Sequence, residues 1–308
     1  MAAAIAVFSS CNKDPYANSG LINVTLSSDS KNSKTEVTPG GLTRWSIGDE
    51  VQLVDADLSL RTFKYAALTP QATAKFEGQL LGNRGKRKYY AFYAPKYTPC
   101  YRTSGYNLTI ERYDLDITED SMTNPELFGQ YCPMIGIPTV FDAADPKDSK
   151  RFQFYHVNCL IEASIASIKG DDRLHNMIFD KAIFEMRAAD NSKPFNTKIK
   201  VNMDDIVGPP EADLPYTSIG EMTDVMSSSF TLNEPHKFGN LLEESDISTF
   251  GIPIFALPTQ IDFEYELDVL FYLNDEIVCR LRKRGRTDGG LKAAGLNVCD
   301  FNENQIIP

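Results

Sequence analysis

The residues of this chain most able to do chemistry are three histidines, six cysteines and a strongly acidic segment near the C-terminus. Zinc ligation is not indicated, because the sequence holds no CxxC pair and no HExxH stretch. No serine, histidine and acid occur in a context typical of nucleophilic catalysis, and there is no P-loop and no GxGxxG after a strand. We therefore expect no catalytic, cofactor-binding or metal site: the protein is predicted to be no enzyme and to need no cofactor.

The acidic segment could in principle supply a carboxylate pair for glycoside hydrolysis, through Glu264 and Glu266. Its alternating pattern, however, predicts a strand with an apolar face and an acidic face, followed by a turn at residues 274–275 and a returning strand. That second strand carries Arg280 and Arg282. We therefore predict cross-strand ion pairs in place of a catalytic pair.

Cys11 is the one residue whose surroundings indicate a covalent modification. It follows Phe8-Ser9-Ser10, which resembles a bacterial lipobox, so residues 1–20 are predicted to be a lipoprotein signal and tether, with Cys11 as the lipidation site. The apolar run before it is shorter than an ordinary secretory segment and lacks a basic start. We expect that the true translation start lies upstream.

The remaining cysteines are odd in number, so they cannot all be paired. Short strand-like runs surround Cys159 and Cys279, where a free thiol packs as a small apolar side chain. We expect buried thiols, with a single disulfide as the alternative. The five are Cys100, Cys132, Cys159, Cys279 and Cys299.

Composition narrows the class further. A formal net charge of −11 argues against nucleic acid as a partner, and 42% hydrophobic residues suffice for a sizeable core. After the N-terminus no segment reaches the ~18 apolar residues of a membrane-spanning helix. The many short alternating runs predict an all-β fold.

Residues 21–54 organise the first part of the chain. An alternating run at residues 21–26 predicts a half-buried strand, and a polar connector with a turn at residues 39–41 follows. Then comes WSIGD, residues 45–49, entering a second strand. Further along, residues 89–93 alternate as a strand covered on both faces.

Four more elements are expected downstream. Residues 107–117 read as one strand and residues 237–245 as a short helix. Residues 141–150 are polar and aperiodic, which favours a linker. Residues 151–170 then open a second set of strands with Phe152, Phe154 and His156 on one face.

Taken in order, these stretches resemble the fimbrillin (Mfa-like) family, subunits of type V pili in Bacteroides-type bacteria. The resemblance is carried by Cys11, Lys34-Thr35, WSIGD, YYAFYAP, FQFYH and the final hairpin. It implies two tandem transthyretin-like β-sandwich domains, at 21–145 and 146–308, with few short helices. It also implies a structural or adhesive fimbrial subunit at the cell outer membrane and surface.

The family resemblance further implies assembly by β-strand complementation, with other pilin subunits as partners and the outer membrane as partner of the lipid anchor. Shaft subunits of that family lose their first strand to a protease specific for arginine or lysine. The corresponding positions here are Arg44 and, second, Lys34. Surface glycans or proteins of a host or of bacteria are further expected ligands, and shaft, tip and anchor roles remain open.

One alternative of another class is a surface lipoprotein that does not polymerise and binds glycans. It would need exposed aromatic platforms, for which KYYAFYAP, Tyr97 and Tyr101 are the candidates. Because aromatic residues on a strand more often fill a core, this reading ranks second.

Overall fold

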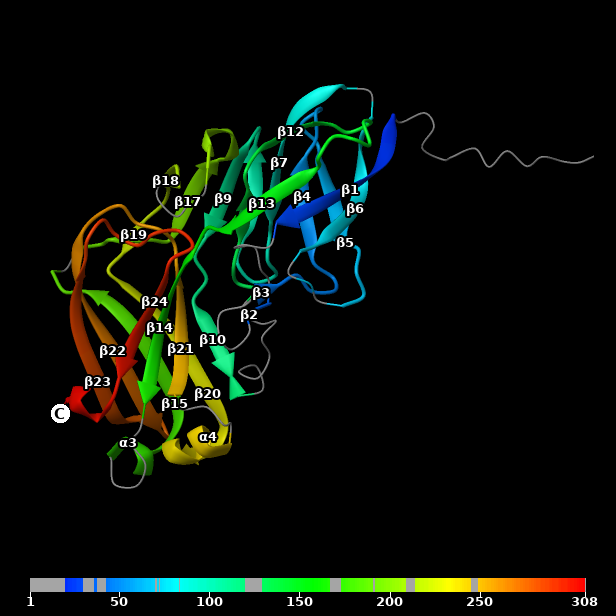
Figure 1. Ribbon diagram of the computed structural model, residues 1–308. Coiled ribbons are helices and arrows are strands. Elements are labelled where there is room, and N and C mark those ends of the chain that lie inside the picture. Colours follow the sequence, from blue (N-terminus) through cyan, green and yellow to red (C-terminus); the bar gives the residue numbers. More distant parts are fainter. Residues whose placement is uncertain are drawn as a thin grey trace, which may run out of the picture.

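The computed structural model of the protein describes residues 20–29, 36–37, 43–69, 71, 73–82, 84–119, 129–166, 173–190, 192–208, 214–244 and 249–307. These residues form strands almost throughout (Figure 1). The α-helices among them are short, α3 (Arg173–Asn176) and α4 (Phe238–Glu244), with 3-10 turns η1 (Met203–Asp205) and η2 (Glu303–Gln305). The expected all-β class and the helix expected at residues 237–245 are confirmed.

Most of the N-terminal half lies in one eight-stranded sheet. Seven of its strands close into a ring, because β11 pairs with both β13 and β7, and closure removes the exposed edges of an open sheet. In ring order the strands are β11 (Met134–Gly136), β13 (Arg151–His156), β1 (Leu21–Asp29), β6 (Lys75–Leu81), β5 (Leu60–Tyr65), β4 (Glu50–Val54) and β7 (Lys86–Tyr93), with β12 (Thr139–Asp142) beside β7. This closed barrel differs from the two-layered sandwich that we expected here.

Strand β7 separates two cores, as its alternation predicted. Tyr89, Ala91 and Tyr93 fill the barrel, whereas Tyr90 and Phe92 pack outside it against a four-stranded sheet. That sheet has the order β18 (Tyr216–Ser218), β17 (Lys198–Asn202), β9 (Asn107–Glu111) and β8 (Cys100–Ser104). The sequence alternation therefore gave the correct faces of the strand, and the fold covers both.

A polar contact also joins the barrel to this second sheet. The carboxylate of Asp204 in η1 pairs with the ammonium of Lys88 and accepts a hydrogen bond from the hydroxyl of Tyr90, 2.7 Å away. The hydrogen bonds from Lys88 and then Tyr90 lower the pKa of Asp204 below its ordinary value.

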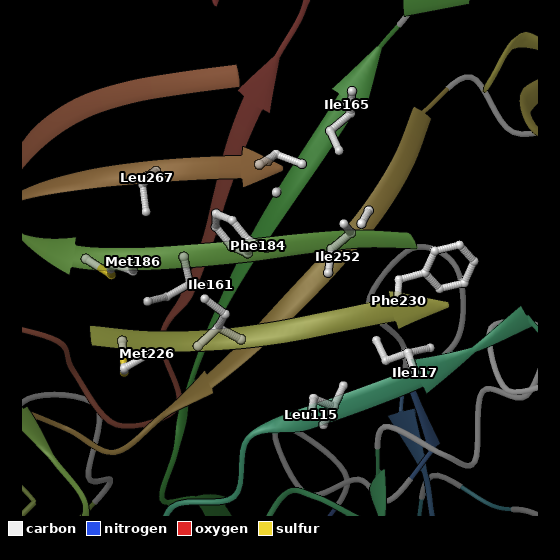
Figure 2. Close-up of a cluster of buried hydrophobic side chains, with 14 of the residues drawn as sticks. Leu115, Ile117, Ile161, Ile165, Phe184, Met186, Met226, Phe230, Ile252 and Leu267 are labelled. Atoms are coloured by element: carbon white, nitrogen blue, oxygen red, sulfur yellow. The ribbon is translucent and has the colours of Figure 1, made fainter. Parts of the chain in front are cut away.

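The C-terminal half consists mainly of two facing sheets. A six-stranded sheet has the order β10 (Leu115–Thr118), β20 (Val225–Lys237), β15 (Ile178–Ala188), β22 (Phe263–Leu273), β23 (Glu276–Thr287) and β25 (Ile306–Ile307). A three-stranded sheet faces it, with β21 (Thr249–Ala256), β14 (Cys159–Ala166) and β24 (Leu296–Phe301). Figure 2 shows Ile161 and Ile252 from the smaller sheet directed toward Phe184 and Met226 of the larger one. Short pairs β16–β19 (Phe195–Asn196, Met222–Thr223) and β2–β3 (Glu36–Val37, Thr43–Arg44) complete the strands.

One strand from the N-terminal half of the sequence belongs to the C-terminal sheet. Residues 107–117 do not form the single strand that we expected, because the chain leaves β9 at Arg112, whose amide N–H bonds to the carbonyl of Thr197. It resumes as β10, which runs parallel to β20 at the edge of the six-stranded sheet. Leu115 and Ile117 of β10 are buried in the C-terminal core (Figure 2). The N-terminal half thus supplies part of the C-terminal sheet.

The chain crosses to the second half after the expected linker. Of the expected linker, Phe141 and Asp142 end β12, and residues 143–150 form turns between β12 and β13, which are both in the barrel sheet. The amide of Asp142 bonds to Asp148 Oδ2 at 2.8 Å. Position 145/146, where we expected the domain boundary, therefore lies between two strands of one sheet. The passage to the facing sheets falls between β13 and β14, at residues 157–158.

The late hairpin follows its sequence closely. Asn274 and Asp275 make the turn with φ of 52° and 66°, values that asparagine and aspartate tolerate. Arg282 donates two 2.6 Å hydrogen bonds to Asp268 and also lies 3.4 Å from Glu266, which Arg284 approaches to 2.6 Å. The predicted cross-strand ion pairing is confirmed for Arg282, whereas Arg280 lies opposite Leu270 and forms no ion pair among the described residues; Arg284 pairs with Glu266 as well.

Candidate functional site at the first strand

Strand β1 is held unequally by its two neighbours in the barrel. Along β6 it is paired antiparallel from Leu21 opposite Leu81 to Ser27 opposite Lys75. Along β13 it is paired parallel, and among the described residues only over Ser27–Asp29. Most of one edge of β1 therefore lacks a strand partner within the part of the chain that the structure describes. The barrel is closed there by a short contact.

The expected alternation of β1 is confirmed. Val24 and Leu26 are 6% and 1% exposed and belong to the barrel core, whereas Asn23 and Thr25 face solvent. Burying an aliphatic side chain of this size contributes about 1.5–3 kcal/mol. Two such side chains are thus worth roughly 3–6 kcal/mol, a large part of the ~5–15 kcal/mol that stabilises a typical domain. Removing β1 would leave an apolar trough and an unpaired edge on β6.

Trp45, the only tryptophan of the chain, lies in the same trough. It is fully buried, and its ring meets Phe76 of β6 at 4.8 Å, Phe154 of β13 at 5.4 Å and Tyr93 of β7 at 5.7 Å, all edge to face. Edge-to-face packing is a favourable arrangement of aromatic rings. Trp45 therefore joins both strands that flank β1 to the opposite wall of the barrel.

The WSIGD stretch forms a turn directly after Trp45 and helps to position its side chain. Gly48 has φ of 95°, a backbone conformation that favours glycine. Asp49 Oδ2 accepts a 2.6 Å hydrogen bond from the amide of Ser46, and Asp49 Oδ1 accepts one from the Tyr93 hydroxyl at 3.3 Å. Burial, and then the nearby Asp49 carboxylate, raise the pKa of Tyr93 well above its ordinary value. The motif thus has a structural role: Gly48 allows the turn, and Asp49 ties that turn to Ser46 and to Tyr93.

A second short pairing, here called a seam, lies between β5 and β6 on the other side of β6, and no sequence pattern predicted it. The β5–β6 pairing covers only Lys64–Glu77 and Tyr65–Phe76, and beyond it a depression of about 380 Å³ is lined by residues of both strands. At Gly78 an added Cβ would lie 2.7–2.8 Å from Phe63 and Thr62 atoms, so only glycine fits. The pair formed by β1 and β6 is therefore joined to the barrel wall by short ladders on both sides.

One buried carboxylate closes the end of that seam. Asp55 is 2% exposed, and its Oδ2 accepts hydrogen bonds from the amide of Leu81 on β6 and from Arg61 Nε on β5, both at 3.1 Å. Hydrogen bonds to a charged group are stronger than neutral ones. The only sequence signal for this role was an acid directly after the apolar β4, which also fits an ordinary turn.

The two predicted cleavage positions lie in the connector between β1 and Trp45. Arg44 ends β3, which pairs with β2, and Lys34 lies outside the described residues. The bond after Arg44 leads directly into Trp45, whose N–H donates to the carbonyl of Gln71 at 3.0 Å while its own carbonyl accepts from Gln71 at 3.1 Å. A protease acting after Arg44 must therefore first release this bridge and the buried ring.

The other predicted site residues are separate from β1. Cys11 lies outside the described residues. The remaining five cysteines are free thiols, so the alternative of a disulfide among them is not what the structure shows. Burial raises the pKa of Cys100, Cys132 and Cys159 to about 12.

The tyrosines considered for a glycan platform divide into two groups. Those of KYYAFYAP, Tyr89, Tyr90 and Tyr93, are buried. Tyr101 is 44% exposed and donates to Glu111 Oε1 at 2.8 Å, whereas Tyr97 stacks on Tyr131 with ring centres 4.9 Å apart. The strand tyrosines therefore serve the core, as their alternation favoured.

Within the described residues no helix is both long and apolar enough to cross a membrane.

Comparison with known proteins gives the class of this fold. No family model and no curated protein matches the chain. Among solved structures, a Bacteroides uniformis protein with an ascribed role in cell adhesion aligns with a TM-score of 0.53 and 14% identity, over 92% of this chain and 94% of its own. A second such protein, from Bacteroides ovatus, aligns with a TM-score of 0.51 and 13% identity, over 93% and 94%. At these identities the likeness concerns the fold, and at that level it confirms the resemblance drawn from the sequence.

Proposed function

We propose that this protein is a structural or adhesive subunit of a bacterial surface fimbria of type V, assembled by β-strand complementation at the position of β1. The observation that carries the proposal is the unequal hold on β1, which is paired along β6 from Leu21 to Ser27 but, within the described residues, with β13 at Ser27–Asp29 alone. The shared fold with proteins to which cell adhesion is ascribed supports it. The role requires binding and no catalysis.

Physically, loss of β1 would create its own replacement site. The vacated edge of β6 would expose unpaired N–H and C=O groups, and the trough left by Val24 and Leu26 would expose Trp45 and Phe76. An incoming strand of the same period relieves both costs. Export as an outer-membrane lipoprotein through Cys11 belongs to the same proposal and places assembly at the cell surface.

The donor strand must come from a second copy, and the C-terminal segment is the candidate. Strand β24 lies at the edge of its sheet, paired in parallel with β14. It exposes Leu296 and Val298, at 60% and 52%, which alternate as a donor requires. Its present pairing means that donation would have to displace β24 from β14.

Sequencing the N-terminus of protein taken from assembled surface filaments tests the proposal. A start at Trp45 or Thr35 supports a polymerising subunit that has lost β1. An intact acylated Cys11 on every assembled molecule makes the protein an anchor, and its absence from filaments refutes the fimbrial role.

A reconstruction in solution isolates the strand-exchange step. The chain beginning at Trp45 should bind a synthetic peptide of residues 20–29, because the peptide restores the β6 ladder and fills the trough. A matched control peptide with serine in place of Val24 and Leu26 keeps the backbone but loses the apolar face, and should not bind. Equal binding of both peptides, or of neither, contradicts the proposed mechanism.

A further inference from the structure

A pocket of about 310 Å³ opens beside the WSIGD turn. Its wall is formed by residues 46–50, by the end of β7, and by Lys96 and Gln130. This volume lies at the lower end of the range for small-ligand sites. The pocket is thus large enough for one or two sugar rings.

The polar groups around the pocket combine both charges with neutral donors and acceptors. Asp49 and Glu50 supply carboxylates to the lining and the exposed Lys96 supplies an ammonium group, and Glu50 lies 3.4 Å from Lys64. Gln130 adds an amide that can donate and accept. Because carboxylate and ammonium groups line the same opening, it has no single strong charge for an anion or a cation to prefer. Ligands with many hydroxyl groups can use every one of these partners.

Ser46 supplies an independent sign of an unmet contact. Its side chain is 7% exposed and lines the pocket, yet its hydroxyl has no hydrogen-bond partner among the described residues. A buried polar group without a partner is unfavourable. A ligand hydroxyl at the floor of the pocket would provide the missing partner.

The aromatic rings next to Lys96 and Gln130 belong to the neighbouring core and do not line the pocket. The amide of Tyr97 bonds to the carbonyl of Gln130, and the Tyr97 ring is stacked on Tyr131, which is itself parallel to Phe255 at 5.9 Å. Lys96 Nζ lies 4.8 Å from the centre of the Tyr97 ring. The Tyr97 ring is thus covered by Tyr131 and Lys96, so the pocket must hold a ligand through its own polar groups.

We propose that this pocket binds a neutral oligosaccharide. Sugar hydroxyls would bond to Glu50, Gln130 and Ser46. The inference goes beyond fimbrial assembly and does not depend on it, because the pocket lies in a single chain with β1 in place.

Saturation-transfer NMR on the intact chain, made soluble by Cys11→Ser, tests the site with two probe sugars. N-acetyllactosamine represents animal glycoproteins and maltotriose represents starch, so the preferred sugar also indicates the source. We expect transfer from at least one of them with a Kd on the order of 1 mM. Transfer from neither sugar overturns the proposal.

Variants at the exposed rim locate the binding. Glu50→Gln with Lys96→Ala should weaken it at least about 10-fold, while the matched pair Glu276→Gln with Lys147→Ala, exposed elsewhere, should leave it unchanged. Trp45 fluorescence verifies that each variant is folded. Binding that survives intact in the first pair places the sugar elsewhere and overturns the assignment. Loss of filament assembly with sugar binding retained would refute the fimbrial role alone.

Discussion

Replacing Leu26 by alanine tests whether β1 holds the barrel closed. The side chain is 1% exposed and lies in the barrel core with Trp45 and Phe76. A buried leucine-to-alanine change costs about 2–5 kcal/mol, depending on how far the site collapses. Because the described part of the chain pairs β1 with β13 at three positions, β1 can shift toward the space left behind. We therefore expect a loss near the middle of that range, about 3 kcal/mol.

Urea unfolding followed by tryptophan fluorescence measures this loss of stability in the barrel itself. Trp45 is the only tryptophan, and it contacts both strands that flank β1, so its emission reports on the barrel. With a denaturant slope of about 1–3 kcal/mol/M, the midpoint should fall by on the order of 1 M. Thr25→Ala is the matched control on the same strand, and as an exposed change it should stay within about 0.5 kcal/mol of the parent.

A result in which the two variants unfold at the same midpoint would refute this reasoning. It would mean that the inward face of β1 contributes little to the free energy of unfolding. An incoming strand would then gain little by burying its side chains in the vacated trough. Strand complementation at this position would then lose its energetic basis. A larger loss for Leu26→Ala, together with a gain in stability when the peptide of residues 20–29 is added to the truncated chain, would support the reasoning.

Three further predictions follow from other parts of the chain. Wild-type cells fed a clickable fatty acid should label the protein, and Cys11→Ala should abolish the label; an unlabelled wild type contradicts lipidation. Folding lowers the pKa of Asp204, chiefly through Lys88, so its contribution to stability is present above the ordinary carboxyl pKa of about 4 and is lost as the pH falls through the lower folded value. Asp204→Asn should therefore lose less stability than the parent between about pH 5 and pH 3 in urea titrations, and parallel curves would contradict the assignment. In the Cys11→Ser chain at pH 8, a thiol reagent should modify the partly exposed Cys279 and Cys299 first, although burial raises the pKa of both, and the three buried thiols only on unfolding; five equally fast thiols would contradict the burial.

The sequence alone determined the local features of the fold, because side-chain period and turn chemistry are encoded by neighbours. Alternation gave the inward and outward faces of β1 and of β7, and Asn274-Asp275 gave the late hairpin. The facing arginines and acids of that hairpin gave its ion pairs, since a two-residue turn fixes which residues are opposite.

Tertiary structure decided how those strands combine. The closure of the barrel through β11, the short parallel contact between β1 and β13, and the passage of β10 into the other half join residues far apart in the chain. Nothing in the period of a strand specifies a distant partner, so a closed barrel and an open sandwich share the same local pattern.

The candidate site shows the same division. The sequence indicated β1, Trp45 and the turn at Asp49, because each has a distinctive residue type at a distinctive spacing. It did not indicate that Asp55 would join β5 to β6, nor that the turn would border a pocket with Lys96 and Gln130. Those features depend on which strands lie next to one another in the folded barrel. How firmly two strands are joined depends on how many of their residues pair, and that number is set by the fold.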